Sequence, residues 1–338
     1  MSKEFLFLSG RISALASKLI TDAQLERMIM AKSPDAAFRV LVELQYADQF
    51  DDSTKSQDFL KIIHQGLLET KKMISEGTDN DESFEFIWKN FDLNNIKRAL
   101  KIKLLEGETE ITDFSEDNGF NWLGSLSVED ISQVVFAQDA ESLAKIPREY
   151  HEALKTADEV FAETANFQTI ELMLDKAHFE FLKRIADGKG VPFLKKWLSR
   201  MADAVNIKTV ARNLFIFETE FTEEMFLPYG VIKFADLAKT DSIEEFENLF
   251  KKYELLALEG ILSDKKSVEE NIINLERALS KEEDFFLQMA EADALGEIEI
   301  PLVYLHKRIK NARKIKYVMM AKFYGMDPER IYDTLKHI

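Results

Sequence analysis

Apolar residues recur along this chain with the spacing of an α-helix. Leu60, Ile63, Leu67 and Ile74 follow one another at intervals of three, four and seven residues, so they share one helix face. Prolines stand where helical patterns begin, a position at which the missing backbone N–H costs no hydrogen bond; they are Pro34, Pro147, Pro192, Pro301 and Pro328. The pattern predicts helices joined by short loops.

The composition favours the same fold class. The chain of 338 residues contains 12 Gly and 6 Pro, together about 5% of its length where ordinary proteins have roughly 12%. With so few turn-forming residues β-hairpins are disfavoured, and an all-α fold is predicted. A hydrophobic fraction of 46% is enough for a large core. The length allows two or three domains, or one elongated assembly of repeats.

Three short segments recur along the chain at a nearly constant spacing. The segment DLNNIK at 92–97 returns as DAVNIK at 203–208 and more weakly as RIKNAR at 308–313, so that Asn95, Asn206 and Asn311 are 111 and 105 residues apart. AKS at 31–33, AQD at 137–139 and AKT at 238–240 are spaced by 106 and 101 residues, and ELMLDK at 171–176 precedes ERALSK at 276–281 by 105. The common order predicts three helical repeats, at 1–106, 107–217 and 218–338.

The recurring asparagines need an explanation, because asparagine disfavours a helix interior by about 0.5 kcal/mol or more relative to alanine. One interpretation is that Asn95, Asn206 and Asn311 each tie one repeat to the next by a buried hydrogen bond. The other is that the three helices line a common inner surface. In that case Lys97, Lys208 and Arg313 would be presented to a partner.

The charge of the chain is negative and uneven. The net charge of −17 argues against binding nucleic acid. Residues 106–118 carry six acidic side chains and no basic one, whereas residues 302–326 carry seven basic side chains and no acidic one. Both runs fit solvated surfaces. The basic run also fits a helix that meets an acidic partner or another part of this chain, through Lys307, Lys310 and Lys314.

Candidate chemistry is sparse. The absence of cysteine excludes disulfides, thiolate metal sites and a cysteine nucleophile. Asp175 and His178 have the spacing of a carboxylate–histidine metal pair without a second such pair, and Asp51-Asp52 resembles the start of an acidic Mg²⁺ motif without its closing carboxylate. No phosphate-binding glycine loop or hydrolase elbow occurs. We therefore expect no catalytic residues, no metal and no cofactor.

The sequence also shows no recognisable targeting signal. The apolar residues 5–8 are too few for a signal peptide and are interrupted by Ser9, Gly10 and Arg11. No apolar run approaches the roughly 20 residues that span a bilayer. We expect a cytoplasmic protein.

Several of these segments together resemble the C subunit of the bacterial and archaeal V/A-type rotary ATPases, which is related to the d subunit of the vacuolar enzyme. The most specific stretch is the end of the chain, where the Asn311 helix is followed by Lys322-Phe-Tyr-Gly and Pro328-Glu-Arg-Ile. Residues 11–19 with 31–33, and residues 171–176 with Phe179, also match. The family often has an acid three residues before the last asparagine, where this chain has Arg308.

The resemblance implies a funnel of three helical units about a pseudo-threefold axis. It implies a non-catalytic rotor subunit on the cytoplasmic face of the membrane, peripheral to it through the rotor ring. Its partners would be that ring and the central shaft, and it would transmit torque for proton or sodium transport or for ATP synthesis. Two alternatives remain at this point: a free-standing helical scaffold that binds a cytosolic protein, and a metal-dependent helical enzyme built on Asp51, Asp52, Asp175 and His178.

Overall fold

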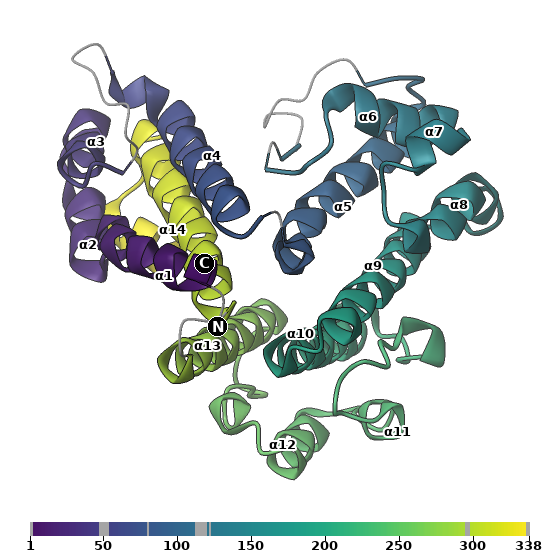
Figure 1. The fold of residues 1–338 in the computed structure, drawn as a ribbon. Coiled ribbons are helices and arrows are strands. Elements are labelled where there is room, and N and C mark those ends of the chain that lie inside the picture. Colours follow the sequence, from purple (N-terminus) through teal and green to yellow (C-terminus); the bar gives the residue numbers. More distant parts are fainter. Residues whose placement is uncertain are drawn as a thin grey trace. The chain divides into compact units, whose positions relative to one another are not determined.

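The predicted all-α fold is confirmed. The computed structural model describes residues 3–46, 54–79, 81–111, 120–121, 123–294 and 298–335, and within these ranges the regular structure is helical, without a strand (Figure 1). Asp51, Asp52 and most of the acidic run at 106–118 lie outside the described residues. In the described part of the chain, no helix combines the length and apolar character required to cross a bilayer.

The chain forms two compact units, each with its own core. The first contains Met1–Asp81 and Glu254–Ile338, and the second contains Glu82–Tyr253. These units do not coincide with the repeats predicted at 1–106, 107–217 and 218–338, and those boundaries stay a prediction.

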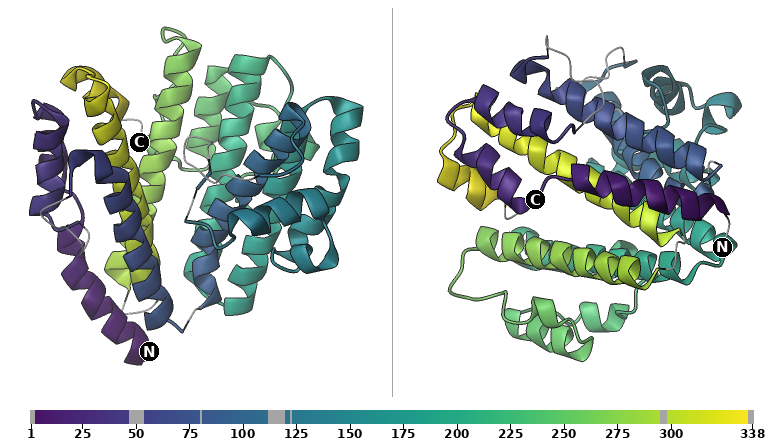
Figure 2. Two further views of the ribbon diagram at one scale, coloured as in Figure 1. Left: turned by 90° about the horizontal axis from the view of Figure 1, so that it is seen from above. Right: turned by 60° about the vertical axis from the view of Figure 1, so that its left-hand side comes forward.

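The first unit is organised around one long C-terminal helix, α14 (Glu299–Phe323), which packs against α4 (Phe59–Gly77), α1 (Lys3–Leu15), α2 (Asp22–Met30), α3 (Pro34–Glu43), α13 (Val268–Asp293) and α15 (Pro328–Leu335). Figure 2 shows α14 lying beside α1 and α4. Twelve residues of α14 are buried, among them Leu302, Leu305 and Met319. The last long helix of the chain thus forms the core with its first helices.

The second unit is organised around α9 (Phe167–Lys189). Its other helices are α5 (Glu85–Lys101), α6 (Val128–Ser132), α7 (Ala140–Leu143), α8 (His151–Thr164), α10 (Pro192–Arg212), α11 (Phe234–Leu237) and α12 (Ile243–Lys252). Two ion pairs show that α5 runs antiparallel to α9. Lys97, near the end of α5, meets Asp175 in the first half of α9, whereas Glu82, just before α5, meets Arg184 near the end of α9. Since α10 also folds back on α9, helices α5 and α10 run parallel to each other.

Local sequence signals explain where many helices begin and end. The hydroxyl of Ser33 accepts a hydrogen bond from the Ala36 N–H, and Pro34 follows it at the first position of α3. Gly190 ends α9 with a φ of 64°, a conformation that glycine adopts without strain. Pro301 differs from the expectation, because α14 begins two residues before it.

Candidate functional site

Asn95 and Asn206 each hold one distant residue by both of its backbone groups. The Asn95 Nδ2 donates to the Asn121 carbonyl, and its Oδ1 accepts from the Asn121 N–H, both at 2.7 Å. Asn206 makes the same pair of bonds to Leu227, both at 2.9 Å. Both asparagines are fully buried. We call this arrangement the asparagine clamp.

Asn311 makes the third clamp, and it joins the end of the chain to its beginning. Its Oδ1 accepts from the Ile20 N–H at 2.6 Å, and its Nδ2 donates to the Ile20 carbonyl at 3.2 Å. Unlike the other two, Asn311 is partly exposed. Each recurring asparagine thus makes the expected hydrogen bonds to a distant segment, and these bonds are buried at Asn206 and partly buried at Asn95 and Asn311. That they tie one repeat to the next stays a prediction.

An aspartate one turn before the first two asparagines extends the clamp. The Asp92 Oδ1 accepts from the backbone N–H groups of Ser125 and Leu126, at 2.7 and 3.1 Å. Asp203 accepts in the same way from Val231 and Ile232, at 3.0 and 3.1 Å. In both cases the acceptor binds the residues four and five positions beyond the one that the asparagine holds. Each aspartate therefore fixes the backbone a few residues beyond the one that its neighbouring asparagine holds.

Two glycines make room for these carboxylates. A Cβ atom at Gly124 would lie 2.4 Å from the Asp92 Oδ1, and one at Gly230 would lie 1.9 Å from the Asp203 Oδ1. Both glycines stand three residues after the clamped residue, in NWLGSL at 121–126 and LPYGVI at 227–232. Sequence reasoning missed this shared glycine, although aligning the two segments would have found it.

The third clamp lacks both partners, since Arg308 replaces the aspartate and Ala23 occupies the glycine position. The buried Arg308 guanidinium lies over the ring of Tyr46 at 3.7 Å and donates to the carbonyls of Lys18 and Tyr46. The segment after Ile20 is capped by its own Thr21, which accepts from the Gln24 N–H. The start of the helix after the third clamp is therefore held differently from the segments after the first two clamps.

Four of the predicted partner-binding residues make contacts within the chain. Lys97 is paired with Asp175 at 2.6 Å, and Lys208 is half-buried near the same carboxylate. Lys307 is paired with Glu291, and Lys310 is paired with Asp284 at 2.6 Å. These ion pairs link α5 to α9 and α14 to α13.

The remaining two residues of that set, Arg313 and Lys314, differ from these four in their contacts. Arg313 is exposed and Lys314 is half-exposed on α14. Neither makes an ion pair within 4 Å in the described part of the chain, although the charge of Glu283 acts on Arg313. They are therefore the members of the predicted set best placed to meet a partner.

Asp175 and His178 have separate partners. Burial raises the pKa of Asp175, and the ammonium group of Lys97 opposes this shift. The His178 Nδ1 lies 2.6 Å from the Tyr150 hydroxyl, and burial lowers the pKa of this imidazole to about 3. Among the described residues, no group of three or more histidine and acidic side chains is arranged to hold a metal.

We expect His178 to make the protein less stable in acid. The unfolded chain protonates this imidazole below its ordinary pKa of 6.5, whereas the folded chain does not until about pH 3. The free energy of unfolding therefore falls as the pH drops below 6.5, by about 2 kcal/mol between pH 7 and pH 5. Urea unfolding of the wild type and of His178→Gln at both pH values measures it. An equal pH dependence in the two proteins would contradict this role.

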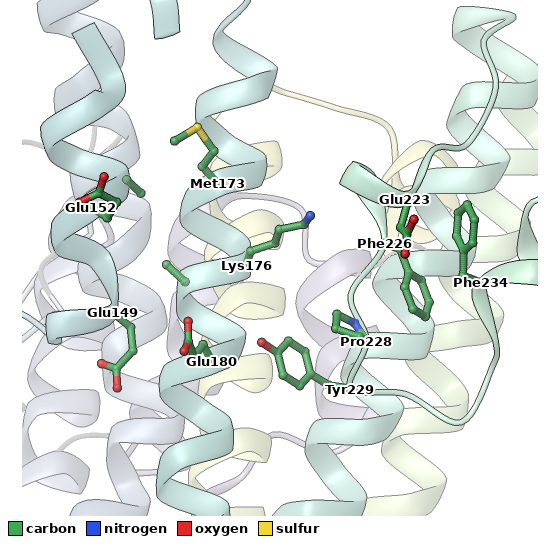
Figure 3. A pocket seen from close by; sticks show the side chains of 12 residues that line it. Glu149, Glu152, Met173, Lys176, Glu180, Glu223, Phe226, Pro228, Tyr229 and Phe234 are labelled. Atoms are coloured by element: carbon green, nitrogen blue, oxygen red, sulfur yellow. The ribbon is translucent and has the colours of Figure 1, made fainter. Parts of the chain in front are cut away.

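An open groove of about 580 Å³ lies in the second unit, between helices α8 and α9 on one side and residues 223–234 on the other (Figure 3). Met173, Phe226 and Phe234 give it apolar walls, and Glu152, Glu180 and Glu223 stand around them. The ring of Tyr229 stacks on Phe179 with centroids 6.0 Å apart, which fixes the orientation of the tyrosine. No sequence pattern indicated this groove, because its walls come from segments far apart in the chain.

Comparison with known proteins identifies the family. Residues 8–334 match the family described as ATP synthase (C/AC39) subunit. A comparison with curated proteins finds no match. The match includes the three clamps, the whole of the second unit and nearly all of the first. The chain belongs to the ATP synthase (C/AC39) subunit family, whose members are subunits of V/A-type ATP synthases.

Proposed function

We propose that this chain is the non-catalytic central-stalk subunit that couples the shaft of a V/A-type ATPase to its membrane rotor ring. The observation that carries this proposal is the family match over residues 8–334. In this role the chain lies on the cytoplasmic face of the membrane, contacts the ring and the foot of the shaft, and transmits torque for ion transport or ATP synthesis. It performs no bond chemistry itself.

The clamps support a role in carrying torque. Torque is transmitted well only by a body that resists internal sliding, and each clamp fixes one residue by two hydrogen bonds. The Asn311 clamp ties α14 to Ile20, so the last long helix is held to the start of the chain. We propose that the repeats 1–106, 107–217 and 218–338 surround a pseudo-threefold axis as a funnel. Helices α5, α10 and α14 would then superpose under rotations near 120°.

Exposed apolar residues at the ends of these helices offer contact points for partners. Helix α5 continues into a π-helical turn over Ile102–Glu106, and α10 into one over Asn213–Phe217. Leu105 is 57% exposed and Ile216, 111 residues later, is 51% exposed. Tyr324, just beyond the end of α14, is 76% exposed. We propose that these tips take part in docking to rotor subunits.

Binding to the rest of the complex tests this proposal. The double reversal Arg313→Glu and Lys314→Glu is expected to weaken binding to the complex lacking this subunit by about tenfold at low salt, because exposed charges contribute attraction that salt screens. The matched control reverses Lys251 and Lys265, both exposed, with the same change in net charge. Circular dichroism checks the fold. Failure of the wild type to bind would refute the proposed function, and equal binding by both variants would refute the role of Arg313 and Lys314.

A further inference from the structure

The groove of the second unit has one end suited to a cation. Figure 3 shows Glu149, Glu180 and Tyr229 toward one end of it, with Lys176 pointing away from them toward the segment that carries Glu223. Burial raises the pKa of the Tyr229 phenol, and the negative charge of the nearby Glu180 carboxylate adds to this shift. A lysine or arginine side chain binds well where a carboxylate lies beside an aromatic ring.

Glu149 gives an independent sign that this end of the groove is built for a ligand. Its side chain is only 6% exposed, and its Oε1 is paired with Arg184 at 2.7 Å. Its Oε2 is buried and has no hydrogen-bond partner among the described residues. A buried carboxylate oxygen without a partner costs free energy, and a donor arriving from a bound segment would satisfy it.

The rest of the groove determines what kind of segment carries the cation. Its walls include the half-buried side chains of Met173, Phe226 and Phe234, whose remaining apolar surface can receive an apolar partner. Its charged side chains are four glutamates and one lysine, so the groove is acidic as a whole. A segment that alternates apolar and basic side chains matches both properties.

We propose that this groove docks a basic amphipathic segment of another subunit of the complex, with a lysine or arginine placed against Glu180 and Tyr229, at the end of the groove that Glu149 lines. The apolar side chains of the segment rest on Met173, Phe226 and Phe234. The identity of the partner as a subunit of the complex rests on the proposed function. The chemistry of the groove does not.

Two measurements on the full chain test the proposal. The first is titration with a synthetic amphipathic peptide of alternating Leu-Leu and Lys-Lys pairs, and the second is binding to the complex lacking this subunit. The groove variant is Glu152→Lys with Glu180→Lys. The matched control is Glu159→Lys with Glu163→Lys; like the groove pair, these glutamates are exposed on the helices of this unit, but they do not line the groove. Both variants change the net charge equally, so they separate groove docking from general attraction to an acidic protein.

The groove variant is expected to bind the peptide and the complex at least tenfold more weakly than the wild type, and the control within about twofold. A photo-cross-linker placed at Phe234 is expected to mark a lysine- or arginine-rich segment of the partner. Equal weakening of peptide binding by both variants would overturn the docking site. If peptide binding follows the groove but the wild type does not bind the complex, the proposed function fails while the groove chemistry stands. If the complex binds both variants as it binds the wild type, or the cross-link marks an acidic segment, docking of a subunit at this groove is refuted.

Discussion

Deletion of this subunit is expected to abolish ATP-driven ion transport while the catalytic head of the complex continues to hydrolyse ATP. A connector between the shaft and the ring makes and breaks no bonds of the nucleotide, so its loss leaves the chemistry of the head in place. Rotation of the shaft would then no longer turn the ring. We expect transport to fall to the background of vesicles without ATP, and the purified subunit to bind and hydrolyse no nucleotide.

The measurement pairs two assays on the same preparation, ATP hydrolysis by the head and ion uptake into vesicles. Adding back the purified chain should restore uptake, which separates loss of this subunit from damage to the membrane part. Normal uptake in its absence would refute the assignment and favour a free-standing helical scaffold. Turnover of ATP by the purified chain would indicate an enzyme.

The sequence indicated which asparagines form the clamps, but it did not indicate which residues these asparagines hold. Asn95, Asn206 and Asn311 stood out because asparagine is unfavourable inside a helix and recurred at a near-constant spacing. Their partners could not be predicted, because the clamped residue lies 26 positions later in one case and 21 in the next. The third asparagine reaches back 291 positions to Ile20. Local periodicity contains no information about such pairings.

The basic run at 302–326 shows a second limit of the sequence. Seven basic residues without an acid suggested a helix that meets either an acidic partner or another part of this chain, and the acids that meet Lys307 and Lys310 lie on the neighbouring helix α13. The charge of one helix says nothing about its neighbour until the packing is known. Arg308 is the extreme case, since this residue of the basic run is buried against Tyr46.

The groove could not be predicted from the sequence for a related reason. Its walls come from α8, from α9 and from a segment some 50 residues later, and none of these carries a recognisable motif. The existence of helices followed from periodicity, and the starts at Pro34, Pro192 and Pro328 followed from the prolines, because these signals act within a few residues. Sites built from tertiary contacts required the folded chain.

The clamps should dominate the stability of the segments that they hold, most strongly at Asn206. In Asn206→Leu the side chain keeps a similar volume, but the Leu227 N–H and carbonyl lose both hydrogen bonds in a site closed to water. Leaving a buried polar group unpaired costs about 1–3 kcal/mol, so the two together are expected to lower the free energy of unfolding by about 3–5 kcal/mol.

Asn311→Leu provides the matched comparison, because the same two bonds are made there by a side chain that is partly exposed. Water can reach the Ile20 groups when the amide is removed, so the expected loss is only about 1 kcal/mol. Urea unfolding followed by circular dichroism measures both variants. Equal losses would show that burial does not set the cost, and a loss below about 1 kcal/mol at Asn206 would show that the clamp is not what holds Leu227. The predicted order, with Asn206 far above Asn311, follows from the different exposure of the two side chains, since both asparagines make the same pair of hydrogen bonds.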